Sequence, residues 1–229
     1  MSDTDSIVRE QIRYYDARAG EYDEWFLRQN RYDRGAEHNQ LWFDEVAELS
    51  AAIERFQPRG HVLELACGTG LFTQRLAPYA KTLTAVDASA EVLKLNSNRV
   101  HAPAIRYLRA DLFKWRPDRQ FDVVFFSFWL SHVPPEQFDS FWQTVRTALA
   151  PGGRVFFIDS RYSVYSTARN HELEGPGATT IKRCLNDGRE FRIIKVFYDP
   201  NELAGRLAGL GWRITMNTTQ QFFLYGSGS

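Results

Sequence analysis

In the segment Val62-Leu-Glu-Leu-Ala-Cys-Gly-Thr-Gly70, a short apolar run passes through a turn with two glycines into a helical pattern. The run predicts a buried strand, with the acid Glu64 near its end. Gly68 and Gly70 allow a sharp turn and let a ligand approach the main chain closely. A tight turn that binds nothing gives the same pattern, so the segment alone does not establish a site.

The same succession of strands and helices continues on both sides of this segment. Strands that are apolar on both faces belong in a parallel sheet covered by helices, so we expect a three-layer α/β domain. Its ligand crevice should lie at the carboxyl ends of the first, second and fourth strands. Beyond the first strand, the patterns predict strands at 82–86, 105–108, 121–126 and 155–158, and helices at 41–56, 71–77, 89–96 and 138–149.

The last third of the chain departs from this pattern. Residues 180–185 and 190–197 flank Asn186-Asp-Gly188, which predicts a hairpin. A helix over 201–210 and one long strand over 212–224 follow, so we expect an antiparallel end on the sheet. The last four residues, Gly226 to Ser229, are predicted to form a flexible tail.

Composition limits the organisation of the chain and its partners. The 229 residues, 44% of them hydrophobic, suit one domain. We divide it into an N-terminal helical cap (1–57), a cofactor-binding core (58–160), a substrate lid (161–178) and a C-terminal hairpin, helix and strand (179–225). The 28 basic and 28 acidic residues balance, and no basic block points to nucleic acid. The sequence is compatible with a monomer or a homodimer.

Cysteine usage and hydropathy indicate the cellular setting. Cys67 and Cys184 are far apart and lack the spacing of metal ligands, so we expect neither a disulfide nor a metal site. No stretch approaches the roughly 18 uninterrupted apolar residues of a membrane span. We therefore expect a cytoplasmic protein with no membrane association.

Two further acids follow predicted strands at the same edge of the sheet. Asp87 comes about 20 residues after the glycine turn, the position at which dinucleotide-binding folds place a ribose-binding acid. A helix cap is the alternative, although Ser89 is better placed for it. Asp111 follows the third strand and is either an adenine-binding residue or a turn residue.

Taken together, Glu64 to Gly70, Asp87, Ala110-Asp111 and Phe121-Asp-Val-Val124 resemble the motifs of class I S-adenosylmethionine-dependent methyltransferases in order and spacing. The resemblance covers residues 60–160. It implies a Rossmann-like, mostly parallel seven-stranded sheet with an antiparallel last strand, and S-adenosylmethionine as the cofactor. The residues that it assigns to the cofactor are Glu64, Ala66, Gly68 and Gly70 at the methionine moiety, Asp87 and Ala88 at the ribose, and Asp111 and Leu112 at the adenine.

Residues outside this core are candidates for covering the cofactor. The segment from Tyr14 to Asp23 resembles the opening helix that closes over the cofactor in small-molecule members of the family. The Tyr14 and Tyr22 hydroxyls would reach the methionine carboxylate, or their rings would lie against the sulfonium. Packing of these tyrosines against the sheet is the alternative.

The loop from Ser127 to Pro135 lies where the transferred methyl group should emerge. Phe128 would border the cofactor, and Trp129 and His132 would meet the substrate. His132 is the candidate general base for a neutral hydroxyl, whereas a carboxylate or thiolate acceptor needs no base. A backbone hydrogen bond before Pro134 is the alternative role for His132.

The segment 161–177 is expected to form a helical lid over the substrate pocket. Arg161 would bind a substrate carboxylate and Tyr165 would line the pocket, unless the segment only packs on the core. We expect in-line methyl transfer to a small-molecule acceptor, on a hydroxyl or carboxylate oxygen. The alternatives are N- or S-methylation, a catalytically silent relative, or a nicotinamide-dependent oxidoreductase, which Thr73 at the third glycine position disfavours.

Overall fold

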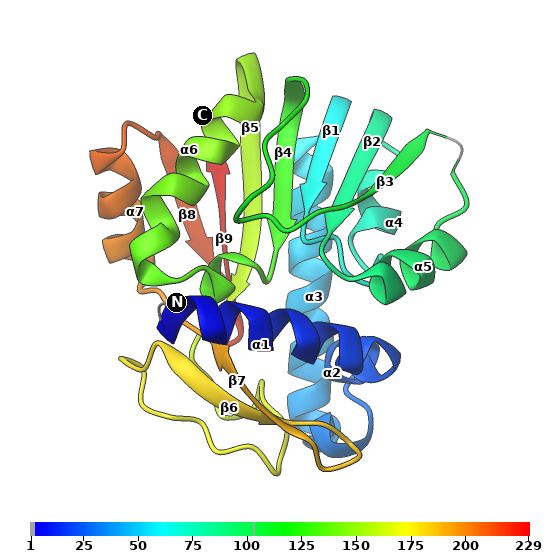
Figure 1. The fold of residues 1–229 in the computed structure, drawn as a ribbon, viewed down its shortest axis with the longest axis vertical. Helices are drawn as coiled ribbons and strands as arrows, with labels where there is room; N and C mark the ends of the chain where they lie inside the picture. The colour runs from blue at the N-terminus through cyan, green and yellow to red at the C-terminus, as the bar shows by residue number, and fades with distance from the viewer. Residues whose placement is uncertain (1–2, 103) are drawn as a thin grey trace.

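The structure is a computed structural model that describes residues 3–102 and 104–229 (Figure 1). Its main sheet has seven strands in the order β3-β2-β1-β4-β5-β9-β8. Strand β9 runs antiparallel to both of its neighbours, and β1 to β5 pair in parallel. The strands are β1 (Gly60–Leu65), β2 (Ala80–Asp87), β3 (Ile105–Arg109), β4 (Phe121–Ser127), β5 (Leu149–Ser160), β8 (Ile214–Thr218) and β9 (Phe223–Gly228).

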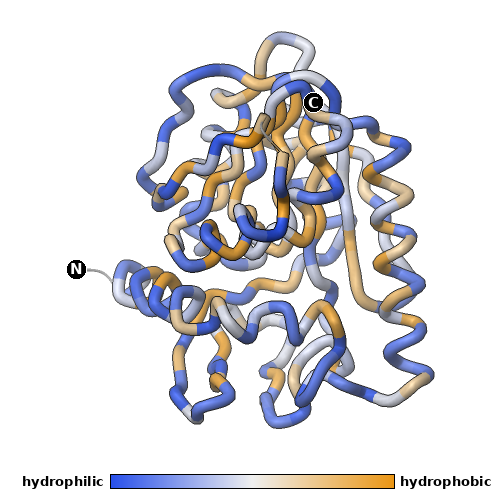
Figure 2. Tube along the Cα trace, turned by 90° about the vertical axis from the view of Figure 1, so that its right-hand side faces the viewer, coloured by the Kyte–Doolittle hydropathy of each residue, from blue (hydrophilic) through white to orange (hydrophobic). Residues whose placement is uncertain are grey.

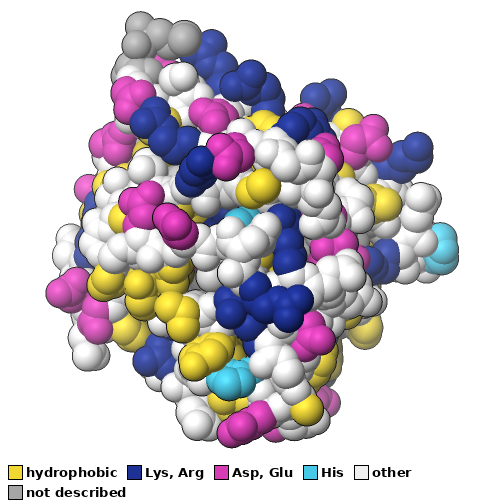
Figure 3. All heavy atoms as spheres, turned by 90° about the horizontal axis from the view of Figure 1, so that it is seen from below, with side chains coloured by type: hydrophobic (Ala, Val, Ile, Leu, Met, Phe, Trp, Pro, Cys, Tyr) yellow, Lys and Arg dark blue, Asp and Glu magenta, His cyan; other side chains and the backbone are white. Residues whose placement is uncertain are grey.

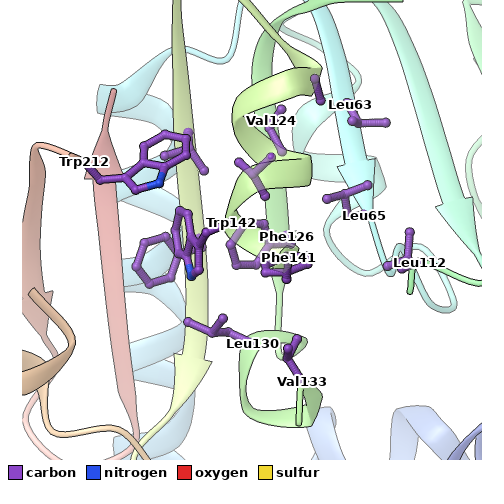
Figure 4. Close-up of a cluster of buried hydrophobic side chains, with 14 of the residues drawn as sticks. Leu63, Leu65, Leu112, Val124, Phe126, Leu130, Val133, Phe141, Trp142 and Trp212 are labelled. Carbon is purple, nitrogen blue, oxygen red and sulfur yellow. The ribbon is translucent and has the colours of Figure 1, made fainter. Parts of the chain in front are cut away.

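Helices cover both faces of this sheet because its central strands are apolar on both sides. Val124 and Phe126 of β4 pack toward one face with Phe141 and Trp142 (Figure 4). The intervening Val123 and Phe125 pack toward the other face, as the two-residue period of a strand requires. The helices of these two layers are α3 (Ala36–Phe56), α4 (Thr73–Leu76), α5 (Ala90–Arg99), α6 (Phe138–Ala148) and α7 (Pro200–Gly209).

This architecture confirms the predicted fold class, with two local corrections at the C-terminal end. The stretch 212–224 is not one strand but a hairpin, because the chain reverses between β8 and β9. The last residues are not a flexible tail, since Gly226 and Gly228 pair with β5. Gly226 is needed there, because a Cβ atom on it would lie 2.6 Å from the Phe157 ring.

The predicted hairpin at residues 180–197 forms, but it does not join the main sheet. Strands β6 (Thr180–Cys184) and β7 (Glu190–Ile194) make a separate two-stranded sheet. The N-terminal helix α1 (Asp3–Arg18) packs on it through Tyr14, which is buried with Ile181 and Ile193. The hairpin therefore finds its apolar partner in α1 rather than in the core of the main sheet.

An N-terminal cap and this hairpin lie together across the carboxyl ends of β1, β2 and β4 (Figures 1 and 2). The segment 161–178, which leads from β5 to β6, is irregular chain, so the predicted helix there is wrong. No helix of the described residues is long and apolar enough to cross a membrane. After α1, the cap comprises the short helices η1 (Ala19–Glu21), α2 (Tyr22–Phe26) and η2 (Asn30–Tyr32).

Candidate active site

Two adjoining pockets lie between the sheet and the cap. The first, here called the cofactor pocket, follows the carboxyl ends of β1, β2 and β4 and is roofed by Gln11, Ile12 and Tyr15 of α1. The second, the acceptor pocket, lies between the cap, the segment 161–178 and β7. Among the described residues, four line both pockets: Tyr15, Tyr22, Phe128 and His132.

The glycine turn after β1 forms one wall of the cofactor pocket. Ala66 and Gly68 line it, both with positive φ (51° and 52°). Gly70 has φ 93° and lies behind this wall, where a Cβ atom would approach Asn96 Oδ1 to 2.7 Å. Asn96 in turn donates to the Gly68 carbonyl oxygen at 3.1 Å, so the turn is fixed from behind and its front face is free for a ligand.

Glu64 lies beneath the turn and is 1% exposed. Its Oε2 accepts a hydrogen bond from the Thr73 hydroxyl at 2.7 Å, while Oε1 is buried without a partner. Burial raises the pKa of Glu64 to about 8. An unpartnered acid at the end of β1 fits a cofactor with a positively charged amino group, which would stabilise the ionised carboxylate.

Asp87, at the end of β2, lines the cofactor pocket and organises its edge. Its Oδ2 accepts from the Gly68 amide and its Oδ1 from the Ser89 amide, each at 3.0 Å. Burial raises the pKa of Asp87 above its ordinary value. Ser89 itself caps α5 by accepting from the Val92 amide at 3.3 Å, as expected from the sequence.

Asp111, Leu112 and Phe113 also line the cofactor pocket, as does Ala88. Asp111 Oδ1 accepts from the Phe113 amide at 3.1 Å and keeps capacity for another donor. Trp129 packs against Phe113 with its ring tilted by 39° and the ring centroids 5.3 Å apart. Trp129 lines the cofactor pocket and not, as predicted, the substrate pocket.

The acceptor pocket is basic. Arg18, Arg183 and Lys195 line it, and among the described residues that form its wall there is no Asp or Glu. From below the cap, Lys and Arg side chains and a histidine gather around a hollow in the middle of the molecular surface (Figure 3). The cavity between these side chains has a volume of about 60 Å³.

Aromatic rings and hydroxyl groups hold these cations in place. The Arg18 guanidinium lies 4.9 Å from the Tyr22 ring centroid and donates to the Tyr32 hydroxyl at 3.2 Å. Its Nε is buried without a partner. Arg183 donates to the Thr167 hydroxyl at 2.9 Å. Neither guanidinium forms an ion pair with an acid of the described residues, so their charges remain available to a ligand.

Lys195 is the most deeply buried of the three cations. Its Nζ donates to the Ser131 hydroxyl at 2.8 Å and lies 3.7 Å from Asp159 Oδ1. Burial lowers the pKa of Lys195 to about 8, although Asp159 opposes the shift. Asp159 also accepts from the Ser131 amide at 2.8 Å, which ties the loop after β4 to β5.

His132 lies at the boundary of the two pockets in a short hydrogen-bonded chain. Its Nδ1 lies 2.7 Å from the Ile194 carbonyl oxygen and its Nε2 lies 2.8 Å from the Tyr15 hydroxyl. Burial, with Lys195 nearby, lowers the pKa of His132 well below its usual range. His132 is therefore neutral at pH 7. His171, on the opposite wall, has its pKa lowered to about 4, first by burial and then by Arg183.

Besides Glu64 and Gly70, which lie behind the glycine turn, three residues predicted at the site lie outside both pockets. Tyr14 is fully buried against the hairpin, and its hydroxyl has no partner. Arg161 donates to the Thr219 and Gln220 carbonyl oxygens, which anchors the turn between β8 and β9. Tyr165 is 39% exposed and stacks on His38 at 4.0 Å. Ser166, Thr167, His171 and Leu173 of the same segment line the acceptor pocket instead.

Sequence reasoning also missed most of the polar wall. The sequence does not distinguish Tyr15 from its neighbour Tyr14 as a pocket residue, and the pattern around Arg18, Arg183 and Lys195 is that of ordinary charges on a helix and a hairpin. The alternation of Arg183 with exposed Lys182 offered a signal, because the two neighbours in β6 must face opposite sides. Among the described residues, no group of three or more His, Cys, Asp or Glu side chains is arranged to hold a metal ion.

The fold and the cofactor pocket are those of an enzyme that binds an adenosine-containing cofactor, with one acid at or near the carboxyl end of each of β1, β2 and β3. Comparison with known proteins narrows this class. A methyltransferase domain model matches residues 62–153. A solved structure described as a DhpI-SAM-HEP complex is 39% identical, with a TM-score of 0.80, and the alignment covers 100% of this chain and 99% of that one.

Curated relatives are more distant. The ubiquinone biosynthesis O-methyltransferase of Pseudomonas putida is 28% identical over 216 residues, which are 90% of this chain and 84% of that protein. Nodulation protein S of Rhizobium tropici is 27% identical over 143 residues, and these span 61% of this chain and 56% of that protein. The chain belongs to the class I S-adenosylmethionine-dependent methyltransferases.

Proposed function

We propose that this methyltransferase transfers the methyl group of S-adenosylmethionine to an anionic oxygen of a small molecule held in the acceptor pocket. The observation that carries the proposal is the charge of that pocket. Arg18, Arg183 and Lys195 converge on it, and His132 and His171 are neutral. Lys195 is paired with Asp159, but neither Arg18 nor Arg183 has an acidic partner among the described residues. Burying these two guanidinium groups is costly unless an anion completes the site.

The number and kind of donors favour an oxyanion over other anions. Arginine forks match carboxylate and phosphate geometry, and Lys195 adds a point charge. Thr167 and Ser166 also line the pocket and add hydroxyl groups. A carboxylate or a phosphorus oxyanion would thus meet donors from the cap, the segment 161–178, β6 and the residue that follows β7. An amine or a neutral apolar acceptor would leave these donors without partners.

An anionic oxygen acceptor can also be methylated without a general base. S-adenosylmethionine supplies an electrophilic methyl group on a good leaving group. The acceptor oxygen provides the electron pair of the new C–O bond, and the electron pair of the broken C–S bond stays on sulfur. No proton leaves the acceptor, so His132 is not needed as a general base. The residues of the chain bind and orient the acceptor and keep water out.

The cap residues complete the site. Tyr15, Tyr22 and Arg18 come from the cap and contribute to the acceptor pocket, so the acceptor is enclosed only when the cap lies over the sheet. We infer that Glu64, Asp87 and Asp111 hold the cofactor at its amino group, ribose and adenine. One similar protein is described as an O-methyltransferase and one similar structure as a complex with SAM and HEP. Both descriptions are consistent with a small-molecule acceptor, but they do not identify the acceptor of this chain.

The test compares matched small molecules that differ in charge. Glycolate and methylphosphonate are titrated calorimetrically into the enzyme saturated with S-adenosylhomocysteine, against neutral glycolamide and dimethyl methylphosphonate. The anions should bind and the neutral partners should not. Arg183→Gln should weaken anion binding about 10- to 100-fold, the value of charged hydrogen bonds. Equal binding of the neutral molecules, or no binding of either anion, would overturn the proposal.

A matched control separates the pocket charge from the overall charge. Arg189 lies in the turn of the same hairpin, is exposed and pairs with Asp187. Arg189→Gln removes the same charge from the same element outside the pocket. Anion affinity should stay within about twofold of the unmodified enzyme, because exposed charges contribute little at physiological salt.

A further inference from the structure

The boundary between the two pockets is built around one hydrogen bond. Of the four described residues that line both pockets, Phe128 is apolar and Tyr22 stacks on Arg18. The other two, Tyr15 and His132, are joined by the 2.8 Å contact between the Tyr15 hydroxyl and Nε2. The methyl group must pass from the cofactor pocket to the acceptor pocket at this boundary. The direction of the hydrogen bond therefore determines whether the Tyr15 hydroxyl presents a hydrogen or a lone pair to it.

The surroundings fix the direction. The Ile194 carbonyl can only accept, so His132 Nδ1 carries the hydrogen at this 2.7 Å contact. In a neutral imidazole the other nitrogen is then bare and can only accept. Tyr15 therefore donates its hydroxyl hydrogen to Nε2. Its oxygen is left with lone pairs and no hydrogen on the side away from His132.

Further contacts fix the hydrogen-bonded residues Tyr15, His132 and Ile194 in position. Gln11 of α1 donates to the His132 carbonyl oxygen and accepts from the Ile194 amide, each at 3.1 Å. Leu130 and Val133, which flank the histidine turn, are anchored in the main hydrophobic core (Figure 4). Tyr15 and His132 also pack edge to face, with ring centroids 5.4 Å apart. This support keeps one tautomer and one hydroxyl orientation.

The geometry points to His132 as a positioning residue that acts through Tyr15, so that the Tyr15 hydroxyl presents only oxygen lone pairs to the cofactor methyl group. Hydrogens on a methyl group bonded to positive sulfur are polarised and are suited to weak C–H···O contacts. With its hydrogen committed to His132, Tyr15 also has none to give the acceptor. The attacking lone pair of the acceptor oxygen therefore stays free.

Charges near His132 support this assignment. The cations Lys195, Arg183 and Arg18 act on His132, and they disfavour a second proton on the imidazole because it would make the ring positively charged. Protonated His132 would donate at both nitrogens and would turn the Tyr15 hydrogen toward the pockets. The inference concerns the methyl donor alone, so it stands whether or not the acceptor is an oxyanion.

The experiment measures how the protein distinguishes the methylated cofactor from its demethylated product. Calorimetry gives the dissociation constants of S-adenosylmethionine and S-adenosylhomocysteine for the unmodified enzyme and for Tyr15→Phe. Loss of the methyl contact should weaken binding of S-adenosylmethionine about two- to fivefold more than binding of S-adenosylhomocysteine. Tyr14→Phe is the matched control, because Tyr14 precedes Tyr15 on α1 and lines neither pocket. Its ratio of dissociation constants should not change.

A double-mutant cycle tests whether His132 acts through Tyr15. His132→Ala, with His132→Gln as a variant closer in size, should raise the dissociation constant of S-adenosylmethionine relative to that of S-adenosylhomocysteine in the unmodified background. In the Tyr15→Phe background, neither variant should raise this ratio further. An unchanged ratio in Tyr15→Phe would overturn the inference. So would a His132→Ala effect of equal size in both backgrounds, which would indicate a role that does not pass through Tyr15.

Discussion

The carboxylate of Asp87 accepts a hydrogen bond from the Gly68 amide at 3.0 Å, so one acid at the end of β2 fixes the glycine turn after β1. The same side chain faces the cofactor pocket. The turn and the ribose-binding edge are therefore not independent.

Asp87→Asn should weaken S-adenosylmethionine binding about 10- to 100-fold, because hydrogen bonds to a charged carboxylate exceed those to a neutral amide. Isothermal titration calorimetry measures the change. Asp118→Asn is the control, since Asp118 lies on the surface in an exposed pair with Arg106. Unchanged affinity in Asp87→Asn would remove Asp87 from the cofactor site.

Glu64→Gln should stabilise the cofactor-free protein, and the gain should grow with pH. Burial raises the pKa of Glu64 to about 8 in the folded protein, against about 4.3 in an unfolded chain. Between these values the folded state binds more protons than the unfolded state, so unmodified protein loses stability as pH rises to about 8. Urea unfolding at pH 5, 7 and 8.5 should show a widening difference. Glu54→Gln, on the exposed face of α3, should show none.

Acceptor affinity should fall as the pH rises through about 8. Lys195 is charged below its lowered pKa of about 8 and neutral above it, so the pocket loses one cation over that range. With glycolate, which is ionised throughout, the dissociation constant should rise up to tenfold per pH unit above 8. Lys195→Met should bind glycolate weakly at every pH. A flat profile for the unmodified enzyme would contradict a part for Lys195 in anion binding.

The cap should loosen when its contact with the glycine turn is removed. Asp23 of α2 accepts from the Thr69 hydroxyl at 2.6 Å and pairs with Arg99 of α5. Asp23→Ala should raise amide hydrogen exchange in α2 and η1 while leaving β1 and β4 protected. Arg106→Gln removes an exposed ion pair far from the cap and serves as the reference. Equal exchange in the two variants would show that the contact does not hold the cap.

Much of the core was predictable because local pattern and tertiary structure agree there. The apolar runs of β1, β2 and β4 are buried on both faces, so each one indicates a central parallel strand. Glu64, Asp87 and Asp111 lie at or near the carboxyl ends of strands that share one edge, so their proximity follows from topology. The hairpin β6–β7 was found by its turn, but nothing in its own sequence shows that it packs on α1.

The acceptor pocket was harder to predict because three separate parts of the chain build it. Arg18, Arg183 and Lys195 are 12 or more positions apart and meet only after the cap folds over the sheet. Arg161 and Tyr165 were chosen by residue type within the right segment. The direction in which an irregular segment presents each side chain depends on its tertiary contacts, such as those of Arg161 with the β8–β9 turn.

The most direct measurement is the destination of the methyl group. The enzyme is incubated with S-adenosylmethionine labelled with ¹³C in its methyl group, together with glycolate or methylphosphonate, and products are examined by ¹³C NMR spectroscopy. We predict an O-methyl signal from an ester of the formerly anionic oxygen, lost on alkaline hydrolysis of the glycolate product. Label on the glycolate hydroxyl as an alkali-stable ether, or turnover of glycolamide in preference to either anion, would contradict the account.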